Sequence, residues 1–301
     1  MSPWRPDRLL EGFEALERRF PDDYDGEVLA TLVRLPTQLA PRGAVLYVHG
    51  FVDYFFQRHM AERFAAEGYA FYALDCRKHG RSLRDHQHPC FCKDIREYYA
   101  EIDWALEVIG AQALLAGHST GGLVGALYAH EGARRRQLRA LWLTSPFFEF
   151  NAPPERRWQL AVATWLGAVA PFASDKGGIR PAYIESLHRN WHGEWDFDLS
   201  LKPYESFPVF FGWVRAIRKA QARLQAGLSI DCPVLLMHSD ETDVNLDWRH
   251  MVRWGPELGT EVTLAAFPGA LHDLVLSRRD IRDALFARLF AWDMTIVHSR
   301  A

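Results

Sequence analysis

Short apolar runs alternate with longer amphipathic segments along most of the chain. Runs too short to form a helix predict buried strands, and one segment that alternates apolar and polar residues predicts a half-buried strand. These strands are expected at residues 27–35, 44–48, 69–74, 113–116, 141–144, 233–238 and 261–267. Segments with apolar residues at helical spacing lie between them and predict helices at 57–67, 95–109, 123–130, 246–254 and 280–292.

Strand and helix signals that alternate in this way predict an α/β protein. Its central sheet should be mostly parallel, with helices on both faces. Residues 5–20 also carry apolar positions at helical spacing, so we expect an amphipathic helix there, ended by Pro21 and the polar residues that follow.

The alternation stops between about residues 146 and 228, where aromatic residues, prolines and glycines gather without a clear strand signal. We therefore expect residues 1–145 and 229–301 to form one core and residues 146–228 to be an inserted helical cap. Ligands of open α/β sheets bind beyond the carboxyl ends of the strands, so the cap should cover a site at that edge.

A glycine-rich turn, Gly117-His118-Ser119-Thr120-Gly121, joins a predicted strand to a predicted helix. The G-x-S-x-G pattern at a strand–turn–helix junction is typical of a nucleophile elbow, in which a sharp turn exposes the serine hydroxyl. The helix dipole would favour negative charge there. A phosphate-binding loop is the alternative, but the P-loop lysine and the G-x-G-x-x-G spacing are absent. Ser119 is therefore the candidate nucleophile.

A serine hydroxyl needs a base to take its proton. His272 lies in the loop just after the last predicted strand, which is where the base is expected if the chain order is serine, acid, histidine. The acid should follow the strand at 233–238, and the candidates are Asp240, Glu241, Asp243 and Asp247. We favour Asp243, because Asp240 leaves little chain to turn toward His272 and Asp247 suits a helix N-cap.

Acyl transfer also needs N–H donors for the oxyanion that develops on the substrate. One is expected from the backbone of Thr120, directly after the nucleophile. The other should come from the loop after residues 44–48, where Gly50 permits close approach and the Phe51 N–H is the candidate. His49 and His118 are expected to support these loops by hydrogen bonds.

Composition narrows the choice of partners. The net charge of −3 favours neither nucleic acid nor an anionic membrane as the main partner, and no apolar stretch is long enough to span a bilayer. The charged start lacks the apolar region of a signal peptide, and four cysteines are too few for a disulfide scaffold, so we expect a cytoplasmic protein with buried thiols. The composition does not indicate an oligomeric state.

We expect no cofactor and no metal. His188, His192 and Glu194 lie close together in sequence but lack the tight spacing of a ligand set.

The stretches HGF at 49–51, LDCRKHGRS at 74–82, GHSTGG at 117–122 and GALHD at 269–273 resemble the α/β-hydrolase superfamily. Within it, the chain is similar to the branch of monoacylglycerol lipases, lysophospholipases and serine aminopeptidases. Members often have Met where this chain has Thr120, and the acid loop here lacks their usual glycine. The resemblance implies the α/β-hydrolase fold, hydrolysis of carboxylic esters without a cofactor, and an Asp-x-x-x-Asp pattern that Asp243 and Asp247 reproduce.

We therefore expect a serine hydrolase that acts on small apolar esters through Ser119, His272 and Asp243. Most aromatic residues of the insertion should form its own core and its contact with the main domain, and the rest could line an apolar acyl pocket. The same residues could instead cleave amide, peptide, thioester or carbon–carbon bonds. A further alternative is a ligand-binding protein on a hydrolase fold that has lost its catalytic activity.

Overall fold

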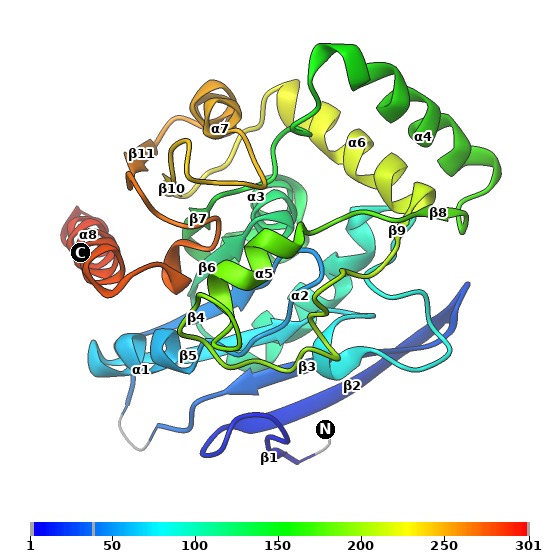
Figure 1. The fold of residues 1–301 in the computed structure, drawn as a ribbon. Coiled ribbons are helices and arrows are strands. Elements are labelled where there is room, and N and C mark those ends of the chain that lie inside the picture. The colour runs from blue at the N-terminus through cyan, green and yellow to red at the C-terminus, as the bar shows by residue number, and fades with distance from the viewer. Residues whose placement is uncertain (1–2, 38–39, 300–301) are drawn as a thin grey trace.

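The computed structural model describes residues 3–37 and 40–299, and a nine-stranded sheet lies at its centre (Figure 1). The strands are β1 (Arg5–Pro6), β2 (Glu14–Asp23), β3 (Gly26–Arg34), β4 (Gly43–Val48), β5 (Tyr69–Asp75), β6 (Ala113–His118), β7 (Leu138–Thr144), β10 (Val234–His238) and β11 (Val262–Ala266). The helices outside the insertion are α1 (Arg58–Ala66), α2 (Tyr99–Ile109), α3 (Thr120–Glu131), α7 (Trp248–Trp254) and α8 (Arg279–Ser299). The seven predicted strands and five predicted helices are therefore confirmed, with shifts at their ends.

The sheet has the strand order β1-β2-β3-β5-β4-β6-β7-β10-β11. Six neighbouring strands run parallel to one another: β5, β4, β6, β7, β10 and β11. At one edge of the sheet, β1, β2 and β3 pair antiparallel, and β3 is also antiparallel to β5. The parallel strands are apolar because both faces are covered. In β4, Val45 and Tyr47 pack toward α1 and α8, whereas Leu46 and Val48 pack toward α2 and α3. The predicted α/β-hydrolase fold is thus confirmed.

The helix predicted at residues 5–20 is wrong, because this segment forms β1 and β2. Gly12 turns the chain with φ of 82°, and β2 then pairs antiparallel with β3. Leu16 and Phe20, spaced four apart as on a helix, also share one face of a strand and are buried there. The segment forms a strand and not a helix because it makes backbone hydrogen bonds with β3. The local sequence pattern does not reveal this pairing.

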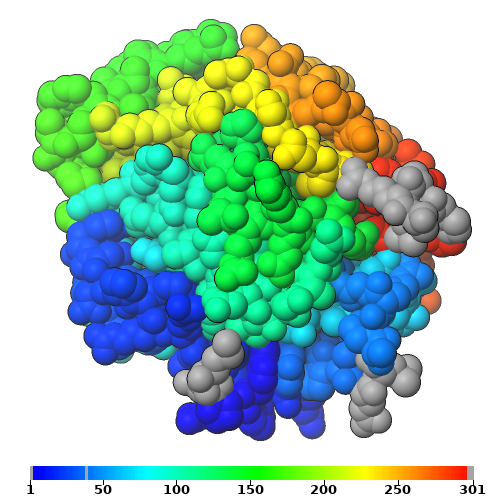
Figure 2. Space-filling model, turned by 180° about the vertical axis from the view of Figure 1, so that it is seen from behind, coloured from blue at the N-terminus to red at the C-terminus, as the bar shows by residue number. Residues whose placement is uncertain are grey.

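The inserted segment (residues 146–228) leaves after β7 and returns before β10. Its elements are α4 (Arg157–Val169), β8 (Ser174–Asp175), α5 (Pro181–Leu187), β9 (Val209–Phe210) and α6 (Phe211–Gln225). Helices α4 and α6 pack side by side, and β8 pairs antiparallel with β9 (Figure 1). From behind, α4 (green) forms one upper edge of the molecule, and the N-terminal strands (blue) lie at the bottom (Figure 2).

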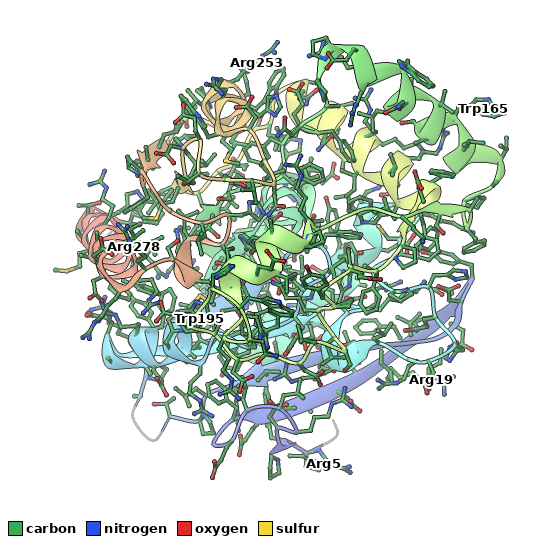
Figure 3. The ribbon with its side chains drawn as sticks, viewed as in Figure 1. Arg5, Arg19, Trp165, Trp195, Arg253 and Arg278 are labelled. Atoms are coloured by element: carbon green, nitrogen blue, oxygen red, sulfur yellow. The ribbon has the colours of Figure 1, made fainter. Side chains whose placement is uncertain are left out.

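Several aromatic residues of the inserted segment do not pack as expected. Trp158 and Trp165 are each 63% exposed, and Trp165 points away from the protein at the outer side of α4 (Figure 3). Others follow the prediction, since Phe197, Phe210 and Trp213 are buried. None of the described helices combines the length and the apolar character needed to cross a membrane.

All four cysteines are buried, as predicted. Burial raises the pKa of the Cys76, Cys90 and Cys92 thiols, which keeps them protonated.

Phe64 tests how much the packing between α1, the sheet and α8 contributes to stability. Its buried ring contacts Phe71, Trp142, Phe286 and Phe290. Phe64→Ala should lower the free energy of unfolding by about 3–5 kcal/mol, because it removes apolar contacts and leaves a cavity. Urea denaturation would measure the change.

The matched control for this prediction is Glu62→Ala on the exposed side of the same helix, where the side chain makes one weak ion pair at 3.8 Å. It should change the free energy of unfolding by no more than about 0.5 kcal/mol. Equal effects of the two substitutions would contradict the packing argument.

Candidate active site

Ser119 lies in the turn between β6 and α3, with φ of 52° and ψ of −115°. This left-handed backbone is strained for a residue with a side chain, and glycines on both sides permit it. A Cβ atom on Gly117 would lie 2.6 Å from the Gly121 carbonyl oxygen, and one on Gly121 would lie 2.3 Å from that of Val48. The turn can therefore close only if both positions are glycine. The sharp strand–turn–helix junction predicted at Ser119 is present.

The elbow presents Ser119 to His272, which lies in the loop after β11. The Ser119 Oγ is 3.0 Å from Nε2 of His272, and the Nδ1 of that ring is 2.8 Å from Asp243 Oδ2. All three residues are buried. Residues far apart in the chain thus form one continuous line of hydrogen bonds. This geometry suits proton transfer from a serine hydroxyl to an oriented imidazole.

Asp243 is held by more than its contact with the histidine. Its Oδ1 accepts hydrogen bonds from the N–H groups of Asn245 at 2.8 Å and Leu246 at 3.0 Å. Burial alone would raise the pKa of the Asp243 carboxyl, but the attraction to His272 and these hydrogen bonds lower it below its usual value. The group therefore stays ionised and fixes the orientation of the imidazole.

The other acids of this loop have different partners. Asp240 accepts hydrogen bonds from Thr242 and from the Gly269 N–H. Glu241 pairs with Arg249 at the surface, and Asp247 caps α7 by accepting the Arg249 N–H. The assignment of Asp247 as an N-cap is confirmed. Of the four candidate acids, Asp243 is the one that contacts His272.

A cavity of about 320 Å³ opens beside Ser119 and His272. One wall is aromatic: the ring of Phe51 lies 4.1 Å from that of Trp213, and Phe147 packs against both Trp213 and Phe150. The remaining lining is mixed and comes from both parts of the chain; it includes Gly50, Asp53, His118, Thr120, Asn151, Gly178, Ile179, Arg180, Tyr183, Lys202, Val209, Asn245 and Leu246. The cavity could hold a small, mainly apolar molecule.

The loop between β4 and α1 (residues 49–57) runs against the elbow. A Cβ on Gly50 would lie 3.2 Å from the Ser119 Cβ, so glycine allows this close approach. His49 accepts the Cys76 N–H at its Nε2, which supports the loop as expected. Val52 is buried and has φ of 48°, an unusual conformation for a β-branched residue. Phe51 and Thr120 both line the cavity beside Ser119.

A buried polar network lies behind the histidine. Asp273 accepts hydrogen bonds from the Gln57 amide and the Val275 N–H, and its carboxylate is 4.0 Å from His118. Burial lowers the pKa of His118, whose ring lies 4.9 Å from that of His272. His118 is therefore placed to support the site by packing and hydrogen bonding.

Within the described residues, one group has the spacing of metal ligands: Asp53, His118 and Asp273. Its carboxylates already have protein partners, since Lys202 pairs with Asp53 and Gln57 donates to Asp273. We interpret it as part of the polar network. The His188, His192 and Glu194 set is not such a group: Glu194 pairs with Arg282.

The sequence did not predict the ion pair between Lys202 and Asp53, whose Nζ and Oδ1 are 2.7 Å apart. Both side chains are almost fully buried, and both line the cavity. Asp53 lies two residues after Phe51, the predicted oxyanion donor, and this position could have indicated that Asp53 lies near the site. Lys202 gives no such signal, because lysines are mostly exposed and the segment around it shows no recognisable pattern.

Other proteins of known structure share this architecture. A soluble variant of monoglyceride lipase from Saccharomyces cerevisiae superimposes with a TM-score of 0.73 and 18% identity, covering 94% of this chain and 96% of its own. The monoacylglycerol lipase of Paleococcus ferrophilus gives 0.67 and 22% identity, covering 85% of this chain and 96% of its own. At identities of 18% and 22%, the similarity establishes a shared fold and no more.

Sequence comparison identifies a nearer relative and the family. The chain is 32% identical over 248 residues to a monoacylglycerol lipase of Mycolicibacterium smegmatis, which covers 78% of this chain and 82% of the relative. The model of the family described as serine aminopeptidase, S33, matches residues 40–278. That match includes the elbow, the histidine loop and the inserted segment. The chain therefore belongs to the serine aminopeptidase S33 family of α/β-hydrolases.

Proposed function

We propose that this protein is a serine hydrolase that cleaves carboxylic esters of apolar acids, as a monoacylglycerol lipase or lysophospholipase does. The observation that carries the proposal is the hydrogen-bonded line Ser119–His272–Asp243 at the edge of a partly apolar cavity. The relative at 32% identity is named a monoacylglycerol lipase, which supports an ester as the substrate.

The proposed reaction uses the chain's own groups. Ser119 Oγ attacks the acyl carbon as His272 Nε2 accepts its proton, and the N–H groups of Phe51 and Thr120 stabilise the oxyanion. His272 then donates the proton to the leaving alcohol, and an acyl-enzyme remains on Ser119. Water, activated by the same histidine, attacks that acyl group and releases the acid. Asp243 holds the imidazole and stabilises its charged form during both steps.

We also propose that residues 146–228 are a cap over this site and that residues 1–145 and 229–301 are the hydrolase core. Supporting this division, the inserted segment supplies Phe147, Tyr183 and Trp213 to the cavity, whereas the core supplies Ser119 and His272. The aromatic wall made by Phe51, Phe147 and Trp213 is the proposed acyl site.

Peptide cleavage from a free amino terminus is a second candidate, because the family description names an aminopeptidase. Such an enzyme needs an uncompensated acid in the cavity to bind the substrate's ammonium group. The acid that lines this cavity is Asp53, and Lys202 already neutralises it. The ester is therefore the better-supported substrate.

Ser119→Ala should abolish labelling by a fluorophosphonate probe and reduce ester turnover by roughly 10⁴-fold or more, as for serines in comparable triads. The reason is that Ser119 Oγ is the proposed nucleophile. Mass spectrometry of the labelled wild-type protein would locate the modified residue, and circular dichroism would check that the variant is folded. Labelling of another serine in the wild-type protein would refute the assignment.

Asp243→Asn should lower kcat for a p-nitrophenyl ester by at least about a hundredfold, because the amide cannot hold the required tautomer or stabilise the imidazolium. Asp240→Asn is the matched control from the same loop, and it should leave kcat close to that of the wild type. Steady-state kinetics would measure kcat for both variants after each is shown to be folded. The reverse ranking would assign the role to Asp240.

For p-nitrophenyl esters, kcat/KM should increase with acyl length from acetyl until the cavity is filled. Each buried methylene contributes at most about 0.8 kcal/mol, or about fourfold. Matched thioesters, anilides and aminoacyl anilides measure the competing bond types. Equal kcat/KM from acetyl to decanoyl would show that the aromatic wall does not bind the acyl chain, and faster cleavage of an aminoacyl anilide would favour the peptidase.

A further inference from the structure

The β4–α1 loop (residues 49–57) carries Phe51, whose N–H is the proposed oxyanion donor. Core contacts hold the far end of the loop: Phe55 N–H donates to Asp75 Oδ1 at 2.8 Å, and Arg81 donates to the Phe55 carbonyl at 2.8 Å. The near end is held by the hydrogen bond between the Cys76 N–H and His49. Between these ends, the Val52 backbone forms a hydrogen bond with the Cys90 thiol of the core.

Further support for residues 51–54 comes from the inserted segment through three nearby side chains. The Phe51 ring packs on Trp213 of α6 with a centroid distance of 4.1 Å. The Asp53 carboxylate pairs with Lys202 at 2.7 Å, and the Tyr54 hydroxyl accepts the Asp198 N–H at 2.7 Å. Lys202 therefore belongs to a set of contacts that join the loop to the proposed cap.

Val52 lies between these contacts and has a strained backbone, with φ of 48°. A buried β-branched residue keeps such a conformation only where its surroundings prevent relaxation. Its neighbours Phe51 and Asp53 both contact the inserted segment. If one contact were lost, Val52 could relax toward negative φ, and the Phe51–Val52 peptide would turn and shift the Cα atom of Phe51. The Phe51 N–H, on the other side of that Cα, would then be displaced from its present position.

Burial makes the Lys202–Asp53 contact a strong and specific one. The Lys202 side chain is 1% exposed and that of Asp53 is 2% exposed, so water screens their attraction very little. The rings of Phe56, Tyr183 and Phe197 surround the Lys202 ammonium group. A buried ion pair adds little net stability compared with apolar side chains, which points to a role in positioning.

We propose that Lys202 is a positioning residue for hydrolysis: by binding Asp53 it fixes the strained turn at Val52 and so places the Phe51 N–H to stabilise the oxyanion. This inference rests on the proposed function. It means that the inserted segment completes the oxyanion hole in addition to lining the acyl site. An ester with a very short acyl chain, which does not reach the aromatic wall, should therefore still depend on Lys202.

The test measures p-nitrophenyl acetate hydrolysis by Lys202→Met. Removing an oxyanion donor costs about 10²–10³-fold in kcat, and displacing one should cost about ten- to a hundredfold. We expect kcat and kcat/KM to fall by the same factor, because the lost interaction exists only in the transition state. The inhibition constant of a methyl trifluoromethyl ketone should rise by that factor, since the oxyanion of its serine adduct occupies the same position.

Lys78→Met is the matched control. Lys78 is also a fully buried lysine with carboxylate partners, Asp25 at 2.8 Å and Asp23 at 3.0 Å, but it does not line the cavity. Its substitution should destabilise the fold with little effect on kcat below the unfolding temperature. Equal loss of kcat in the two variants would overturn the proposal. So would a Lys202→Met enzyme with unchanged kcat and a raised KM, because Lys202 would then contact the substrate.

Lys202→Met leaves the Asp53 charge unpaired and could unfold the chain. The double variant Asp53→Ala/Lys202→Met removes both charges, and it should fold while keeping the reduced kcat. Asp53→Asn/Lys202→Gln retains a side-chain hydrogen bond without charge and should recover most of the lost kcat. Wild-type kcat in the Asp53→Ala/Lys202→Met enzyme would refute the positioning role. Absence of ester hydrolysis by the wild-type protein would instead refute the proposed function.

Discussion

The strained turn at Ser119 is the constraint on which the geometry of the site depends. With φ of 52°, the chain reverses direction between β6 and α3 within a few residues, which brings the start of α3 against the end of β4. Gly121 then lies so close to the Val48 carbonyl that no side chain fits there. The same closeness brings Gly50 beside the Ser119 Cβ. One sharp turn therefore brings together the proposed nucleophile and both backbone segments that carry the proposed oxyanion donors.

Features that depend on local sequence could be predicted well. The apolar runs of β4, β6, β7 and β10 are buried on both faces, and the glycines of the elbow meet a steric demand that the local sequence reveals. The choice of Asp243 rested on the length of chain needed to turn toward His272, 29 residues later, and the structure brings these two side chains into contact. Short-range geometry was sufficient for these positions.

Features that depend on distant partners could not be predicted. The segment that forms β1 and β2 has a pattern compatible with a helix, and pairing with β3 determines its structure. The contact between Lys202 and Asp53 joins residues 149 positions apart, through a lysine that the sequence gives no reason to bury. Lys202 is a charged residue that is buried, whereas Trp158 and Trp165 are large apolar residues that remain exposed. In each case the outcome was decided by where another segment lies.

The two proposed oxyanion donors also differ in whether local sequence or a distant segment determines their position. Thr120 is the first residue of α3, so its N–H direction is fixed by the helix and by the glycines that pack it on β4 and β6. Phe51 lies in a loop with a strained neighbour, and contacts from Trp213, Lys202 and Asp198 brace that part of the loop. One donor is therefore built into the core, whereas the other depends on where the inserted segment sits. Variation in the inserted segment could thus change the rate of the reaction as well as the choice of acyl chain, without any change in Ser119, His272 or Asp243.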